Sequence, residues 1–226
     1  MAKTISIAID GPAGAGKSTI ARRLAGELGY YYVDTGAIYR TVAYFLDLLG
    51  VSPKDADGVR RYIDELTIEI EYDEEGKQHM IMNGMDVSDE IRTQDISQKA
   101  SLVSAHPEVR EMLLDMQREV AEKHNVIMDG RDIGTVVLPK ATVKIFLTAD
   151  PAVRARRRCD ELLAKGQKAD FEQTLKDIQQ RDYQDTHRAI APLKMARDSV
   201  KVDTSELNID EVVAAIREIA GKKIPV

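Results

Sequence analysis

One stretch near the start of the chain combines glycines, a lysine and a hydroxyl in a spacing that can bind phosphate. Residues 11–18 read GPAGAGKS and match the phosphate-loop (P-loop) pattern G-x-x-x-x-G-K-[ST]. Glycines let such a loop wrap so that backbone N–H groups face inward, and the N-terminus of a following helix adds partial positive charge. We therefore predict a nucleoside triphosphate site built from the following residues: Gly11, Pro12, Ala13, Gly14, Ala15, Gly16, Lys17, Ser18 and Thr19.

Two residues are candidates to hold the Mg²⁺ ion that accompanies a bound triphosphate. Ser18 occupies the position whose hydroxyl ligates Mg²⁺ in P-loops, and Lys17 before it would neutralise the β- and γ-phosphates. Asp129 ends the apolar run 126–128, where a carboxylate could order the waters around the ion; a turn-forming or helix-capping aspartate is the alternative. The four histidines are scattered without ligand spacing, so we predict no other metal site.

The class of P-loop protein follows from what the sequence lacks. A GTPase would carry an Asn-Lys-x-Asp motif, but the three asparagines are followed by Gly84, Val126 and Ile209. There is also no Ser-Gly-Gly transporter signature, and 226 residues are too few for most motor or helicase cores. These exclusions favour a small-molecule kinase.

A kinase whose acceptor is itself a phosphate needs a second cationic site, and the arginines of this chain suit one. Arg131 and Asp132 follow a strand end, which places them in the crevice of an open α/β sheet. Three arginines share one helical face at spacing i, i+3 and i+4: Arg154, Arg157 and Arg158. Three more charged residues share a face if their helix runs that far: Arg181, Asp185 and Arg188. Each arginine alone could be a solvated surface residue, but together they indicate a site for several phosphates.

The elements that must position these residues follow a strand–helix–strand–helix order. Strands are predicted at 5–9 and 30–33, each followed by a helix, at 17–28 and 37–49. This order predicts an α/β fold in which helices cover a parallel sheet. Later elements are predicted as strands at 126–128, 143–147 and 200–202 and as helices at 95–104, 107–123, 151–165, 171–183 and 209–220.

Residues 50–92 differ from the rest of the chain. A short helix at 55–65 precedes residues 66–72, where apolar and polar residues alternate with the period of a half-buried strand. Residues 78–82 are predicted to form the returning strand of a hairpin, and Asn83-Gly84 predicts a tight turn after it. We predict a small antiparallel insertion, of substrate-binding or merely decorative role, in a single-domain core formed by 1–49 and 93–226.

Composition limits the other function classes. The chain has 43% hydrophobic and 31% charged residues, which suits a globular protein and argues against general disorder. A formal net charge of −6 argues against nucleic-acid binding through phosphate attraction. The single cysteine, Cys159, suits a reducing compartment, and no run approaches the ~20 apolar residues of a membrane span. We expect a soluble cytoplasmic protein without nucleic-acid or membrane partners.

Four strings, read together, resemble the bacterial cytidylate kinases: residues 34–40 DTGAIYR, 90–92 EIR, 129–137 DGRDIGTVV and 188–193 RAIAPL. The resemblance covers essentially the whole chain. It implies a nucleoside monophosphate kinase fold with a parallel-sheet P-loop core, a monophosphate-binding insertion at about 50–92 and a mobile helical lid at about 151–167. It implies transfer of the γ-phosphoryl group of ATP to CMP or dCMP, by a protein that we expect to be a monomer.

The resemblance also implies which residues surround the monophosphate: Thr35, Arg40, Ser101, Arg110, Arg131, Asp132, Arg181, Asp185 and Arg188. The family position that matches Thr35 is commonly Ser, which also carries a hydroxyl. Asp132 is the candidate reader of the cytosine amino group, because a carboxylate accepts from an amino group and repels the carbonyl of uracil.

Catalysis in such a kinase needs no general base, since the acceptor oxygen is already ionised. It needs alignment and charge neutralisation of a loose, in-line transfer. The expected catalytic residues are Lys17, Arg154, Arg157 and Arg158. The alternatives are a kinase for another acceptor, such as UMP, AMP or dephospho-coenzyme A, and a non-catalytic module that binds ATP without turnover.

Overall fold

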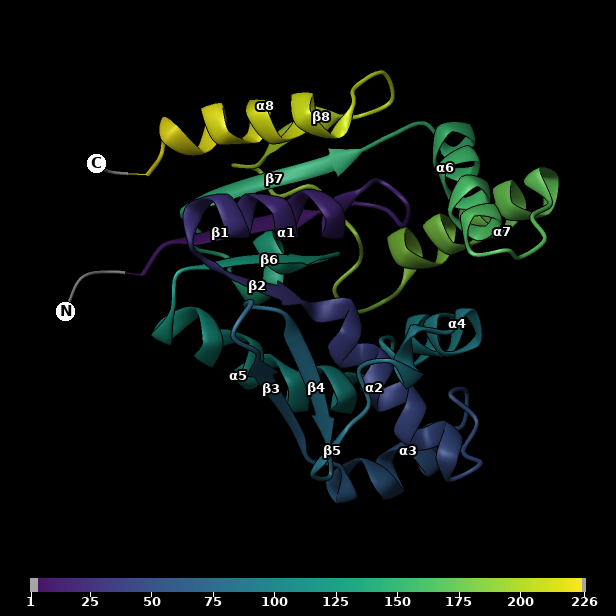
Figure 1. Ribbon diagram of the computed structural model, residues 1–226. Helices are drawn as coiled ribbons and strands as arrows, with labels where there is room; N and C mark the ends of the chain where they lie inside the picture. The colour runs from purple at the N-terminus through teal and green to yellow at the C-terminus, as the bar shows by residue number, and fades with distance from the viewer. Residues whose placement is uncertain (1–3, 225–226) are drawn as a thin grey trace.

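The computed structural model describes residues 4–224, which form two separate β-sheets with helices around them (Figure 1). The larger sheet is parallel, with strand order β2-β6-β1-β7-β8, and the smaller is antiparallel, with order β3-β4-β5. The strands are β1 (Ser6–Asp10), β2 (Tyr31–Asp34), β3 (Ile68–Tyr72), β4 (Gln78–Met82), β5 (Met85–Asp86), β6 (Val126–Gly130), β7 (Val143–Thr148) and β8 (Val200–Asp203). The predicted α/β class is confirmed.

The α-helices are α1 (Lys17–Leu28), α2 (Thr35–Leu48), α3 (Ala56–Tyr62), α4 (Gln94–Val103), α5 (Pro107–Lys123), α6 (Pro151–Ala164), α7 (Phe171–His187) and α8 (Ile209–Gly221). Two 3₁₀ turns, η1 (Ile63–Glu65) and η2 (Glu90–Arg92), and a π-helical turn, η3 (Ile133–Val137), complete the fold. No helix between residues 4 and 224 is long and apolar enough to cross a membrane.

The central strands β1 and β6 are buried on both faces, because helices or the small sheet cover each face. Ile7, Ile9 and Ile127 pack on one face with the apolar residues of α1 and α8. Ala8 and Met128 point to the other face, where α2, α5 and the small sheet cover them. The period-2 alternation along β1 and β6 thus divides the core into two clusters.

The small sheet confirms the predicted hairpin. Strands β3 and β4 pair in antiparallel register from Ile68 opposite Met82 to Tyr72 opposite Gln78. The turn between β4 and β5 has positive φ at both central residues, 48° at Asn83 and 80° at Gly84, as a tight Asn-Gly turn requires. In Figure 1 this sheet lies below the large sheet, next to α2 and α5.

Several predicted boundaries were wrong, each for a local reason. Helix α2 begins at Thr35 rather than residue 37, because the Asp34 carboxylate accepts from the Ala37 N–H at 2.9 Å and caps it. Strand β6 continues to Gly130, since it pairs with β1 through that residue. Helix α7 runs four residues beyond the predicted end at 183 but stops before Arg188, which has extended backbone angles.

The P-loop leaves β1 through a glycine that no other residue can replace without strain. Gly11 has φ +151°, and a Cβ at this position would lie 1.9 Å from the Leu147 carbonyl oxygen of neighbouring β7. The start of the loop is therefore fixed by contact between two backbones. Gly26 in α1 is the opposite case, because a Cβ there would meet nothing within 4 Å.

We expect Gly11→Ala to lower the free energy of unfolding by about 3 kcal/mol, because the new methyl group must displace the backbone of β7. The matched variant Gly26→Ala should raise it by about 0.5–1 kcal/mol, since alanine favours an exposed helix position. Urea unfolding followed by circular dichroism measures both. A Gly11→Ala protein as stable as the wild type would contradict the close approach of the two strands.

Candidate active site

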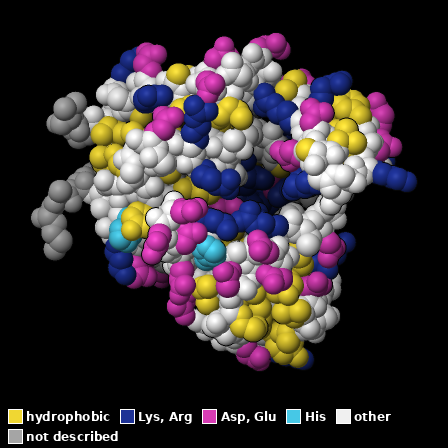
Figure 2. Space-filling model, in the orientation of Figure 1, with side chains coloured by type: hydrophobic (Ala, Val, Ile, Leu, Met, Phe, Trp, Pro, Cys, Tyr) yellow, Lys and Arg dark blue, Asp and Glu magenta, His cyan; other side chains and the backbone are white. Residues whose placement is uncertain are grey.

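A cavity of about 350 Å³ lies at the carboxyl ends of β1, β2 and β6. Parallel α/β sheets bind ligands at this edge, because the loops that follow the strands converge there. In the space-filling view, Lys and Arg side chains gather inside the hollow between the upper and lower parts of the molecule (Figure 2). Seven cationic side chains and four carboxylates line the cavity, so positive charge is in excess.

Most of the residues predicted from the sequence meet in this cavity. Those that line it are Ala13, Gly14, Lys17, Ser18, Thr35, Arg40, Ser101, Arg110, Asp129, Arg131, Asp132, Arg158, Arg181, Asp185 and Arg188. The predicted residues that do not line it are Gly11, Pro12, Ala15, Gly16, Thr19, Arg154 and Arg157. The structure therefore brings together segments that are up to about 170 residues apart in the sequence.

Lys17 lies at the first position of α1, directly after Gly16, whose φ of 87° turns the loop into the helix. Its side chain is buried, and Nζ donates to the Pro12 carbonyl oxygen at 2.8 Å. Burial, together with repulsion from Arg131, lowers the pKa of Lys17 to about 7. The ammonium thus lacks the countercharge that a phosphate would supply.

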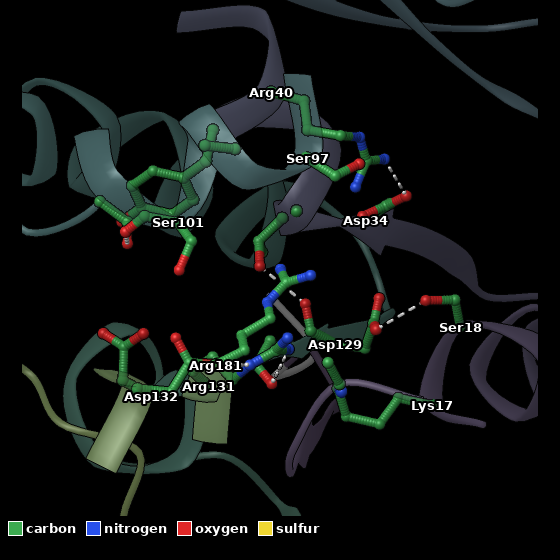
Figure 3. A pocket seen from close by; sticks show the side chains of 18 of the residues that line it. Lys17, Ser18, Asp34, Arg40, Ser97, Ser101, Asp129, Arg131, Asp132 and Arg181 are labelled. Carbon is green, nitrogen blue, oxygen red and sulfur yellow. Dashed lines mark hydrogen bonds and ion pairs between the residues drawn. The ribbon is translucent and has the colours of Figure 1, made fainter. Parts of the chain in front are cut away.

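Ser18 and Asp129 meet as the sequence predicts for a Mg²⁺ site. Ser18 Oγ donates to Asp129 Oδ2 at 3.0 Å (Figure 3). Tyr32 Oη donates to Asp129 Oδ1 at 2.9 Å. Burial and the nearby Asp34 raise the pKa of Asp129. The carboxylate accepts from two hydroxyls rather than from a turn, and hydroxyl and carboxylate oxygens are donors that Mg²⁺ prefers. The residues present therefore fit that ion.

Two arginines of the cavity that lie outside the P-loop are each paired with a carboxylate. Arg40 Nη2 pairs with Asp34 Oδ2 at 3.0 Å (Figure 3). Arg131 Nε pairs with Asp185 Oδ2 at 2.8 Å. Burial opposes ionisation of Asp185, but the charges of Arg131, Arg181 and Arg188 and the hydrogen bond from Arg131 together outweigh it and lower the pKa of that carboxyl. Each pair fixes a guanidinium at the rim of the cavity with some of its N–H groups still available.

Arg181 lies between these pairs and is under-satisfied. Its Nε is buried without a hydrogen-bond partner, as is Nε of Arg40. Burial, with repulsion from Arg131, lowers the pKa of Arg181 to about 10. A buried donor that lacks an acceptor is costly, and an anion that enters the cavity would relieve that cost.

Asp132 forms the centre of a second cluster further along the cavity. Arg110 Nη2 pairs with Asp132 Oδ2, and Arg188 Nη2 lies 3.3 Å from Oδ1. Both arginines also contact Ser104: Arg110 donates to its carbonyl oxygen at 3.1 Å and Arg188 to its hydroxyl at 3.3 Å. Helix α7 ends at His187, so Arg188 reaches this cluster from outside it. The helix therefore does not run far enough for the shared face with Arg181, which was predicted on that condition, but both arginines line the cavity.

The hydroxyl of Thr35 makes a structural contact, and the residue also lines the cavity. Thr35 Oγ1 donates to the Asp129 carbonyl oxygen at 2.7 Å, which ties the start of α2 to β6. A serine hydroxyl would make the same bond.

Asp10 is a functional residue that the sequence reasoning missed. Its carboxylate accepts from the backbone N–H of Ile133 and of Gly134, both at 2.7 Å. Burial raises the pKa of Asp10 to about 6 in spite of these bonds. Asp10 therefore fixes the segment just after Asp132 to the end of β1. The available signal was an acidic residue closing an apolar strand directly before the P-loop.

Other cavity residues outside the predicted set are Asp34, Gly36, Tyr39, Ser97, Ala100, Ser104 and Gly130. The guanidinium carbon of Arg110 lies 5.6 Å from the centre of the Tyr39 ring, within range of a cation–π interaction. Ser97 lies one helical turn before Ser101 on α4, so the i, i+4 spacing could have found it.

The three arginines of α6 have different surroundings. Arg154 is buried and donates to Asp182 at 2.6 Å and to the Ala13 carbonyl of the P-loop at 3.1 Å. Arg157 donates to the hydroxyl and the carbonyl of Thr204, at 3.0 and 2.5 Å. Arg158 is the one of the three that lines the cavity, where it pairs with Glu161 at 3.0 Å. The three arginines therefore have different partners, although they were predicted to share one helical face.

The parallel sheet, the P-loop at the end of β1 and the arginine cluster facing it define a P-loop kinase. Comparison with known proteins identifies which one. The family model "Cytidylate kinase" matches residues 7–222. Curated cytidylate kinases from Carboxydothermus hydrogenoformans and Lactobacillus johnsonii are each 50% identical to this chain; the alignments cover 96% and 97% of it and 97% and 95% of those proteins. The chain belongs to the cytidylate kinase family.

Solved structures show the fold only. An uncharacterized protein from Eubacterium ventriosum superposes with a TM-score of 0.52 at 14% sequence identity, over 96% of this chain and 99% of that one. At this identity the likeness supports the sheet-and-helix arrangement described above and says nothing of the substrate.

We expect Lys17→Met to raise the free energy of unfolding of the nucleotide-free protein. A lysine whose pKa falls from 10.5 to about 7 on folding destabilises the folded state most at and below pH 7, and the effect fades as the pH rises toward 10.5. The gain should be several kcal/mol at pH 7 and small near pH 10.

Urea unfolding at a series of pH values measures this gain. Lys123→Met is the control, because Lys123 lies exposed on α5 and its loss should change stability by no more than about 0.5 kcal/mol. A Lys17→Met protein that is less stable than the wild type at pH 7 would contradict the uncompensated burial of this charge.

Proposed function

We propose that this chain transfers the γ-phosphoryl group of ATP to CMP or dCMP, forming ADP and CDP or dCDP. The observation that carries the proposal is the opposition of two phosphate-binding groups in one cavity: the P-loop with Lys17 on one side and the arginines of the acceptor side on the other. Membership of the cytidylate kinase family supports CMP as the acceptor.

The donor side would be held by the P-loop amides and Lys17, with Arg158 as the arginine of α6 nearest to the transferred group. Ser18 would ligate Mg²⁺ and Asp129 would orient its waters; when bound, the ion supplies charge neutralisation to the β- and γ-phosphates. Arg40, Arg131 and the under-satisfied Arg181 would bind the acceptor phosphate. Because an ionised phosphate oxygen attacks, these residues act by alignment and electrostatics, without a general base.

The base of the acceptor would be read at the Asp132 cluster. Asp132 would accept from the cytosine amino group, while Arg110 and Ser101 would contact the remaining base edge. Arg188 would orient Asp132, and Asp185 would accept from a ribose hydroxyl. A uracil would place a carbonyl against the Asp132 carboxylate, which is repulsive.

Residues 50–92 would form the monophosphate-binding insertion and residues 151–167 the lid. Closure of the lid would let Arg154 and Arg157 exchange their present partners, Asp182 and Thr204, for the migrating phosphoryl group. The monomeric state and the cytoplasmic location stay predictions from the sequence.

ADP release from ATP and Mg²⁺ tests the function, with CMP, dCMP, UMP or AMP added one at a time. We expect turnover with CMP and dCMP and little with UMP or AMP, because the carboxylate of Asp132 favours the amino group of cytosine. Turnover with UMP or AMP instead would support a kinase but contradict CMP as its acceptor. If the protein still binds ATP but releases no ADP with any of the four acceptors, a non-catalytic binding module is favoured.

Asp132→Asn should lower the ratio of kcat/KM for CMP to that for UMP by about 10- to 100-fold, because an amide can donate to the uracil carbonyl. The measurement is steady-state kinetics with both acceptors. Asp198→Asn is the control, since Asp198 pairs with Lys144 away from the cavity. An unchanged ratio in Asp132→Asn would remove this residue from base recognition.

A further inference from the structure

One polar side chain lies on the buried face of the small sheet. In β4, residues 78, 80 and 82 alternate with more exposed neighbours, so Gln78 shares a face with Met80 and Met82. Gln78 is only 8% exposed and does not line the cavity. A buried amide at an apolar position needs hydrogen-bond partners, and the identity of those partners indicates its role.

Gln78 contacts both backbone groups of Asp34, and its Nε2 also donates to Met80 Sδ of the same strand at 3.0 Å. Gln78 Oε1 accepts from the Asp34 N–H at 2.7 Å, and Nε2 donates to the Asp34 carbonyl oxygen at 3.4 Å. Asp34 ends β2, which is an edge strand of the large sheet and so has one row of backbone groups without a neighbouring strand. Tyr72 also bonds to the backbone of this edge strand, since its hydroxyl donates to the Tyr32 carbonyl oxygen at 3.1 Å.

The carboxylate of Asp34 links this anchor to the cavity. Oδ1 accepts from the Ala37 N–H at 2.9 Å and Oδ2 pairs with Arg40 at 3.0 Å (Figure 3). The pair is closely packed: a Cβ at Gly36 would lie 3.0 Å from Asp34 Oδ1 and 3.1 Å from Arg40 Nη1. A shift of the Asp34 backbone would therefore move the Arg40 guanidinium, whose Nε has no partner of its own.

We propose that Gln78 is a positioning residue for the acceptor phosphate. It fixes the backbone of Asp34 at the junction of β2 and α2, and Asp34 in turn orients Arg40 toward the cavity. The inference rests on the proposed function, in which Arg40 binds the phosphate of CMP. This proposal gives the small sheet a defined role. Its side chains Gln78 and Tyr72 bond to backbone groups of the edge strand β2, and Gln78 thereby positions Arg40 in the acceptor site.

Gln78→Met keeps the length of the side chain and removes both hydrogen bonds. We expect KM for CMP to rise about tenfold, the factor that corresponds to loss of one to two buried hydrogen bonds. KM for ATP and kcat should stay within about twofold of the wild type, because Lys17 and the P-loop do not contact Gln78. Steady-state kinetics with each substrate varied in turn measures this split.

A double-mutant cycle separates positioning from general destabilisation. If Gln78 acts through Arg40, adding Gln78→Met to Arg40→Met should leave KM for CMP at the value of Arg40→Met alone. Multiplicative effects of the two substitutions would overturn the inference. Gln78→Glu is a second variant in case Gln78→Met folds poorly; its carboxylate still accepts from the Asp34 N–H but cannot donate to the carbonyl, and it too should raise KM for CMP selectively.

His79→Gln is the matched control on the same strand. His79 contacts Asp73 and Asp86, both in or next to the small sheet, so its loss should lower the melting temperature without changing KM for CMP. Wild-type values of KM for CMP in both Gln78 variants would overturn this inference alone. Absence of CMP-dependent turnover by the wild-type chain would overturn the proposed function and the inference with it.

Discussion

The burial of several like charges next to one another is the constraint on which the rest of this structure depends. Burial first, and then repulsion from neighbouring cations such as Arg131, lowers the pKa of Lys17 to about 7 and that of Arg181 to about 10. The fold tolerates them because Asp129 and Asp185 lie among them. Carboxylates are too few to neutralise the site, and this deficit is what polyanionic ligands would fill.

The carboxylates also orient the cations. Asp34, Asp132 and Asp185 each accept from at least one arginine, and each lies at or near the end of a strand or helix of the core. A guanidinium held on one edge can present its other N–H groups in a fixed direction, so less conformational entropy is lost when a phosphate binds. Arg181 lacks such a partner at Nε, and burial within the cluster restrains it instead.

The sequence predicted what depends on local pattern. The P-loop, the apolar run of β1, the alternation in β3 and the Asn83-Gly84 turn follow from local pattern alone, and the resemblance named most of the cavity residues. Contacts between distant segments could not be predicted, because spacing does not encode which partner a side chain reaches. The pairing of Arg154 with Asp182, the position of Arg188 beyond the end of α7 and the contact of Gln78 with the backbone of Asp34 are of this kind.

Asp10 joins the two halves of the cavity through one side chain. It immediately precedes the P-loop, and its carboxylate binds the backbone directly after Asp132, the proposed reader of the base. A substitution at Asp10 would thus disturb the donor and acceptor sites together. One side chain thus couples two binding sites, so position 10 offers no route to alter the recognition of one nucleotide without that of the other.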